Sequence, residues 1–318
     1  MFKKIFNDEA GVSPIVATLV LVVVAIAGAA AVGTIMGSFS SDVAEDASVG
    51  DATSAASTEL LIAGSTTVQP VSELLAEAYM EDHQGVKITV QGGGSGAGVS
   101  SVAMGISDIG AASRAVKDSE LDKYPDVQTH QIGGSAVVII ANDAMIGGAL
   151  NTTNVTAADL QALYNGSVST LAGVTVTPYQ RAESSGTEDT FVDFIGEDIS
   201  DDVEGAVGNG GVLAAVQDDT AGVGFVDFGY ADGADDIFMV GVKNDNAEFG
   251  PEDITASNIK KEFGAEDEYY LHDLTRPLNY LTNGEPTALE QSFLNFAMSP
   301  ASTEYFSEVG YFAINEIV

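Results

Sequence analysis

One arginine stands four residues before a Ser-Gly-Thr turn that opens an amphipathic helix. Ser185 or Thr187 can cap this helix, and Gly186 lets a ligand approach the free N–H groups of its first turn. A helix N-terminus carries a partial positive charge and favours an anion. The planar guanidinium of Arg181 suits two oxygens of a tetrahedral oxyanion. The stretch therefore predicts an oxyanion site; a capped helix beside a surface arginine is the alternative.

Two further segments repeat this arrangement of strand, hydroxyl- or glycine-rich turn and helix. The apolar strand 60–63 is followed by residues 64–70, which contain Ser65, Thr66 and Thr67 before a proline suited to a first helical turn. The strand 86–90 is followed by a glycine-rich turn that contains Ser95 and Gly96. No Gly-Lys-Ser/Thr ends that turn, so it is not a P-loop. Both segments predict helix starts that can receive an anion.

These motifs, taken together, resemble the phosphate-binding proteins (PstS type) of phosphate ABC transporters. The resemblance runs from about residue 60 to the C-terminus, in the family's order. It rests on segments 64–70, 93–96, 108–113, 181–187, 208–212, 222–226 and 276–278. The family's usual tryptophan after residues 165–166 is absent, which concerns a peripheral loop. The resemblance implies a phosphate site formed by Ser65, Thr66, Thr67, Ser95, Gly96, Asp108, Arg181, Ser185, Gly186 and Thr187.

The resemblance also implies an α/β fold of the periplasmic-binding-protein-like type II class, with two lobes joined by two crossing hinge strands. Alternation of strands and helices supports an α/β class independently. We expect lobe I at residues 58–135, lobe II at residues 136–274, and a return to lobe I at residues 275–318. Segments 136–141 and 277–281 are the expected crossing strands, and closure around an ion would be a hinge motion.

Asp108 is expected to determine selectivity. A buried carboxylate only accepts hydrogen bonds, so it can bind a protonated phosphate oxygen but finds no donor on sulfate. A polar group left unpaired in this way costs about 1–3 kcal/mol or more. We therefore expect phosphate to be preferred over sulfate.

The charge balance is strongly acidic. The 318 residues contain 47 Asp and Glu against 11 Lys and Arg, for a net charge of −36. Such a surface repels nucleic acid, which is therefore not an expected partner. The composition resembles that of proteins from salt-loving archaea. With no cysteine, thiolate catalysis and lipid modification of an N-terminal cysteine are excluded.

The N-terminus offers another tether. Lys3 and Lys4 precede a run without charge between Glu9 and Asp42, long enough to cross a bilayer as a helix. Residues 11–16 resemble the start of archaeal type IV pilin-like precursors, although acidic residues stand where a basic one is usual. An ordinary secretory signal is the alternative. We expect a transmembrane or pilin-like signal segment at residues 1–37 and a flexible linker at residues 38–57.

An extracellular, membrane-tethered protein that captures phosphate for an ABC importer is the expected function. Its expected partners are phosphate, the permease subunits and, through the N-terminal helix, the cell membrane; no cofactor or metal is expected. A pilin-like structural protein and a phosphatase-type enzyme are the alternatives. The second would need a metal cluster or an activated nucleophile. No signature pairs His83, His130 or His272 with a nucleophile, so we expect no enzyme.

Overall fold

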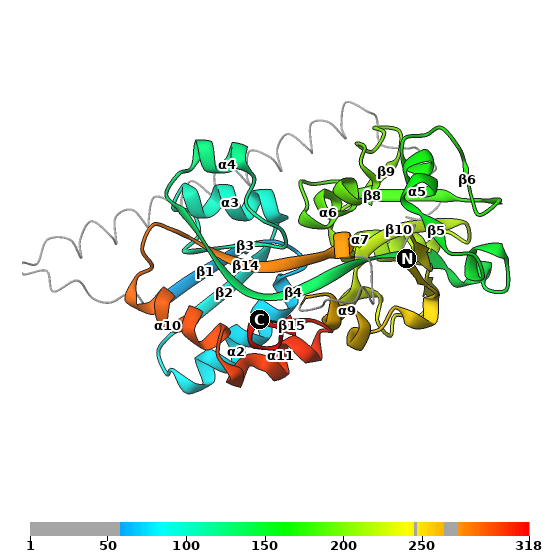
Figure 1. Ribbon diagram of the computed structural model, residues 1–318. Coiled ribbons are helices and arrows are strands. Elements are labelled where there is room, and N and C mark those ends of the chain that lie inside the picture. Colours follow the sequence, from blue (N-terminus) through cyan, green and yellow to red (C-terminus); the bar gives the residue numbers. More distant parts are fainter. Residues whose placement is uncertain (1–57, 245–246, 264–271, 318) are drawn as a thin grey trace, which may run out of the picture. The chain divides into compact units, whose positions relative to one another are not determined.

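The structure is a computed structural model that describes residues 58–244, 247–263 and 272–317. These residues form an α/β fold of two lobes around one continuous ten-stranded sheet (Figure 1). Two smaller sheets of three and two strands accompany it. The expected α/β class and the two-lobed arrangement are confirmed.

Lobe I opens the described chain with three parallel strands and the helices between them. Its elements are β1 (Glu59–Gly64), α2 (Gln69–Asp82), β2 (Lys87–Gly92), α3 (Ser95–Ala103), β3 (Ile109–Ala112), α4 (Asp118–Lys123) and the start of β4 (Val127–Asn142).

Lobe II follows with many short strands and three longer helices. Its elements are η1 (Asp143–Met145), η2 (Ala149–Asn151), β5 (Val155–Thr156), α5 (Ala157–Tyr164), β6 (Thr170–Leu171), β7 (Val174–Thr175), β8 (Thr177–Arg181), α6 (Gly186–Ile195), β9 (Glu204–Ala206), α7 (Gly208–Asp218), β10 (Gly222–Asp227), α8 (Phe228–Ala231), β11 (Ile237–Met239), β12 (Val242–Lys243), β13 (Glu248–Phe249), η3 (Pro251–Asp253), α9 (Ala256–Glu262) and η4 (His272–Leu274).

The chain then returns to lobe I. The returning elements are β14 (Thr275–Asn283), α10 (Ala288–Ala297), η5 (Pro300–Ser302), α11 (Thr303–Glu308), β15 (Phe312–Ala313) and α12 (Ile314–Ile317). Helix α10 packs Phe293, Leu294 and Ala297 into the core of lobe I beside α2.

Strand β4 connects the two lobes. The main sheet has the order β2-β1-β3-β14-β4-β10-β8-β9. Residues 127–136 of β4 pair with β14 of lobe I, and residues 137–141 pair with β10 of lobe II. The second part is an uninterrupted buried run because both faces of the sheet are covered there. Separate hydrophobic cores lie in the two lobes.

The strand directions position the site. Strands β1, β2 and β3 are parallel in lobe I, and β8, β9 and β10 are parallel in lobe II. The helices that follow β1, β2, β8 and β9 therefore begin at the carboxyl ends of these strands, where ligands of open α/β sheets bind.

Among the residues that the structure describes, none of the helices has the length and apolar character needed to cross a membrane. The membrane segment expected at residues 1–37 and the linker expected at residues 38–57 lie outside the described residues.

Candidate functional site

Four helix N-termini supply hydroxyl and N–H groups to one buried cluster. Ser65 Oγ accepts the N–H of Thr67 at 3.2 Å, at the start of α2. Ser95, the first residue of α3, accepts the Gly186 N–H of α6 at 3.2 Å through its hydroxyl. Helix α7 begins at Gly208 and adds Asn209, whose Nδ2 donates to Thr67 Oγ1 at 2.9 Å. The cluster thus joins helix starts from both lobes.

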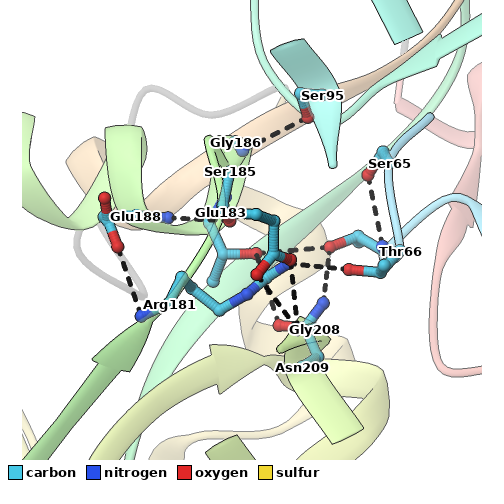
Figure 2. Close-up of polar contacts among 12 residues, drawn as sticks. Ser65, Thr66, Ser95, Arg181, Glu183, Ser185, Gly186, Glu188, Gly208 and Asn209 are labelled. Atoms are coloured by element: carbon cyan, nitrogen blue, oxygen red, sulfur yellow. Dashed lines mark hydrogen bonds and ion pairs between the residues drawn. The ribbon is translucent and has the colours of Figure 1, made fainter. Parts of the chain in front are cut away.

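Arg181 ends β8 and contacts both lobes (Figure 2). Its Nη1 donates to Thr187 Oγ1 at 3.1 Å, and its Nη2 donates to Thr66 Oγ1 at 2.9 Å. Arg181 also forms an ion pair with Glu183, whose carboxylate accepts the Gly208 N–H at 3.1 Å. Burial lowers the pKa of Arg181, while the Glu183 carboxylate opposes that effect. Arg181 is 4% exposed, and its guanidinium contacts partners on several sides.

A second arginine lies in the same cluster. Arg276 enters with β14, is 2% exposed, and donates from Nη1 to Thr187 Oγ1 at 3.0 Å. Its Nη2 donates to Thr67 Oγ1 at 2.9 Å and forms a 2.6 Å ion pair with Asp227. Both arginines therefore converge on the hydroxyl of Thr187.

Asp227 balances the charge of Arg276 and is fully buried at the end of β10. Its Oδ1 accepts the Ser135 hydroxyl at 2.8 Å and the Gly229 N–H at 3.0 Å. Both carboxylate oxygens of Asp227 therefore accept hydrogen bonds, and the one that faces Arg276 orients its guanidinium. The other guanidinium hydrogens of Arg276 can then donate to the hydroxyl cluster.

The structure brings together most of the residues expected in the site. Ser65, Thr66, Thr67, Ser95, Arg181, Gly186 and Thr187 all take part in the cluster. Ser185 instead caps α6, with its Oγ accepting the N–H groups of Thr187 and Glu188 at 3.1 and 3.3 Å. Gly96 lies against Ser184, where an added Cβ would approach the Ser184 hydroxyl to 2.7 Å.

Asp108 does not join the cluster. It is exposed, it precedes β3, and its Oδ2 accepts the Leu61 N–H at 2.7 Å. The cluster lies beyond the opposite end of β3, where Ser113 hydrogen-bonds Ser65 and Ser95. The expectation of a buried carboxylate at Asp108 is therefore wrong, and the physical reason is strand direction: the residue before a strand and the residue after it lie at opposite edges of the sheet.

Sequence reasoning missed Ser113, Asn209, Asp227 and Arg276 as site residues. The segments with Asn209 and Arg276 were part of the family resemblance, but nothing local assigned their side chains to the site. The signal available for Arg276 was its rarity, since the chain has only three arginines. Its ion pair with Asp227 joins β14 and β10, which are far apart in sequence.

The cluster offers hydrogen-bond donors of the kind that bind oxyanions. Two guanidinium groups, several hydroxyls that can rotate, and N–H groups at helix starts converge on one place. Histidines lie elsewhere: His83 stacks on Tyr79 at 3.9 Å, and His130 contacts the Thr282 hydroxyl at 2.9 Å. Within the described ranges, His, Asp and Glu form no group of three that could hold a metal ion. The arrangement is suited to binding an anion.

Comparison with known proteins agrees with this fold. Residues 49–301 match the PBP superfamily domain, so the chain belongs to that superfamily. The phosphate-binding protein PstS of Bacillus subtilis is 27% identical over 276 residues, which cover 82% of this chain and 83% of the relative. The phosphate-binding protein PstS of Staphylococcus saprophyticus is 27% identical over 248 residues, with 73% and 72% coverage.

Two solved structures share the architecture. A putative phosphate ABC transporter substrate-binding protein with bound phosphate from Clostridium perfringens has a TM-score of 0.68 at 23% identity, covering 80% of this chain and 99% of that one. An ABC-type phosphate transport receptor from Vibrio cholerae has a TM-score of 0.61 at 24% identity, with 80% and 99% coverage. At these identities the structures establish the fold.

Proposed function

We propose that this chain binds inorganic phosphate between its lobes and delivers it to an ABC importer. The observation that carries the proposal is the convergence of Arg181 and Arg276 on Thr187 Oγ1, at 3.1 and 3.0 Å, among hydroxyls from both lobes. Such a constellation fits a small tetrahedral anion with several oxygens. The relatives' recorded ligand, phosphate, is such an anion.

The site residues proposed for phosphate are the cluster members Ser65, Thr66, Thr67, Ser95, Arg181, Gly186 and Thr187, joined by Ser113, Asn209 and Arg276. Backbone and hydroxyl dipoles can hold an anion on a protein of net charge −36 because they act at contact distance. Distant surface carboxylates are screened by salt.

Binding without catalysis is the second part of the proposal. Hydrolysis of a phosphate ester needs an activated nucleophile or a metal-bound water. In the cluster, the hydroxyls of Ser65, Ser95 and Thr187 hydrogen-bond other hydroxyls, an amide or arginine, and none has a histidine as its partner. Incubation with a model phosphate ester tests this, and sustained phosphate release that requires Arg181 would contradict it.

The third part concerns location. We propose that residues 1–37 tether the chain to the cell membrane, with the two lobes outside the cell. The run without charge between Glu9 and Asp42 supports this part. The chain should fractionate with membranes, and deletion of residues 1–37 should release it. Recovery of the intact full chain wholly in the soluble fraction would contradict the tether.

The decisive experiment is isothermal titration of the full chain with phosphate, sulfate and molybdate at one fixed salt concentration. We expect phosphate binding in the wild type and a loss of about 1.5–3 kcal/mol in Arg181→Ala, the scale of a hydrogen bond to a charged group. Arg181→Lys should recover only part, because the planar fork is lost. Unchanged affinity in Arg181→Ala would remove this residue from the site.

A further inference from the structure

A second group of charges crosses between the lobes outside the anion cluster. Asp189 lies in the first turn of α6 in lobe II. Its Oδ2 forms a 2.6 Å ion pair with Arg114 Nε, and its Oδ1 lies 2.8 Å from Lys117 Nζ. Both cations belong to lobe I, between β3 and α4. Each oxygen of the Asp189 carboxylate therefore forms an ion pair with one cationic side chain of the opposite lobe.

Lobe I holds Arg114 in position by itself. Its Nη1 and Nη2 donate to the two oxygens of Glu120 at 2.7 and 2.8 Å, and Nη1 also donates to the Ala115 carbonyl. Glu120 is anchored in turn by the Lys117 N–H at 2.9 Å. The bidentate pair occupies one edge of the guanidinium, and Nε remains for Asp189. Docking Asp189 therefore requires little further ordering of Arg114.

The charge distribution shows why such contacts matter for closure. Residues 58–135 and 275–318 contain 15 acidic and 5 basic side chains, and residues 136–274 contain 26 and 4. Both lobes are thus strongly negative, and bringing them together is opposed by repulsion. Two of the chain's 11 basic residues face one carboxylate across the lobes. This local attraction opposes the repulsion where the lobes meet.

We propose that Arg114, Lys117 and Asp189 form an inter-lobe latch that stabilises the closed arrangement and slows release of the bound anion. These residues are positioning residues, because their contacts join the lobes and not the cluster of Arg181 and Arg276. The effect on release rests on the proposed function, whereas the effect on lobe closure does not. Arg114 is 7% exposed at its side chain and Asp189 is 24% exposed, so water screens the pair less than a surface pair.

The test combines a distance measurement with binding kinetics. The chain has no cysteine, so cysteines can be introduced at Met104 and Val168, which are 57% and 42% exposed in lobes I and II. Spin labels at these positions report lobe closure in the full chain with and without phosphate. We compare Asp189→Asn with the wild type. Arg114 keeps its Glu120 partner in this variant, so lobe I should fold.

We expect Asp189→Asn to shift the label distances toward an open arrangement and to raise the phosphate dissociation rate about tenfold, with a smaller change in association rate. The apparent Kd rises because the closed fraction falls. Asp193→Asn is the matched control: it lies on the same helix, is exposed, and carries the same charge. It should behave as the wild type.

Wild-type distances together with a wild-type release rate in Asp189→Asn would overturn the latch. An equal shift in Asp193→Asn would also overturn it, because the effect would then be one of general charge. If the wild type binds no phosphate, the proposed function fails, while the label distances in the absence of phosphate still decide the latch.

Discussion

Replacement of Arg276 by methionine should destabilise the fold strongly. Methionine retains an unbranched chain but removes the charge that faces Asp227 at 2.6 Å. Asp227 is 0% exposed and would keep only uncharged partners, which include the Ser135 hydroxyl, the Gly229 N–H and the Tyr311 hydroxyl. An uncompensated charge would then remain buried.

The magnitude follows from that burial. Removing one partner of a buried ion pair costs about 3–5 kcal/mol in free energy of unfolding. For a domain of this size, each kcal/mol lowers the Tm by about 2–4 °C, so Arg276→Met should melt about 10 °C below the wild type. The double variant Arg276→Met with Asp227→Asn should regain a large part of this loss, because no charge is then left unpaired. The two substitutions should therefore be non-additive.

The assay is thermal and urea unfolding of the four proteins of this double-mutant cycle, without phosphate and at one salt concentration. Lys87→Met is the matched control, because Lys87 pairs with Glu59 at 3.8 Å on the surface, with side chains 68% and 72% exposed. It should change stability by at most about 1 kcal/mol. A loss below about 1 kcal/mol in Arg276→Met, or a double variant less stable than Arg276→Met, would refute the reasoning.

Three further outcomes are expected. Gly186→Ala should weaken phosphate binding at near wild-type stability, because its Cβ would come within 2.6 Å of the Ser113 hydroxyl of the opposite lobe. Gly210→Ala is the control in the titration, because the nearest atom to its added Cβ lies at 3.9 Å. Asp108→Asn should leave phosphate and sulfate affinities unchanged, and an altered ratio would return Asp108 to the site. Burial raises the pKa of Glu188 to about 7, above the usual value of 4.5 for a glutamate, so the folded state holds that proton more tightly. Stability should therefore fall as pH rises from about 4.5 to 7, and Glu188→Gln should remove this part of the pH profile measured by urea unfolding.

Local signals predicted the helix starts well. Each predicted start follows a strand and a turn that contains glycine or hydroxyl residues, and contacts close in sequence, such as Ser185 Oγ with the Thr187 N–H, can form there. The apolar run 136–141 also predicted a strand in the interior of the sheet, because a strand that is covered on both faces carries apolar side chains on both. Arg181 could be assigned to the site from the sequence because it lies close to the turn that opens α6.

Strand direction and pairing decided the rest. Asp108 belongs to a recognisable segment, yet it precedes β3 and therefore lies at the edge of the sheet away from the helix starts. Arg276, Asp227 and Asn209 come from three separate segments, and only the antiparallel pairing of β4 with both β14 and β10 brings the first two together. The sequence by itself determined the individual anion-receptive helix starts, because capping and dipole effects act within one turn. The tertiary structure decided which charges meet, because ion pairs between distant segments depend on the register of the strands that carry them.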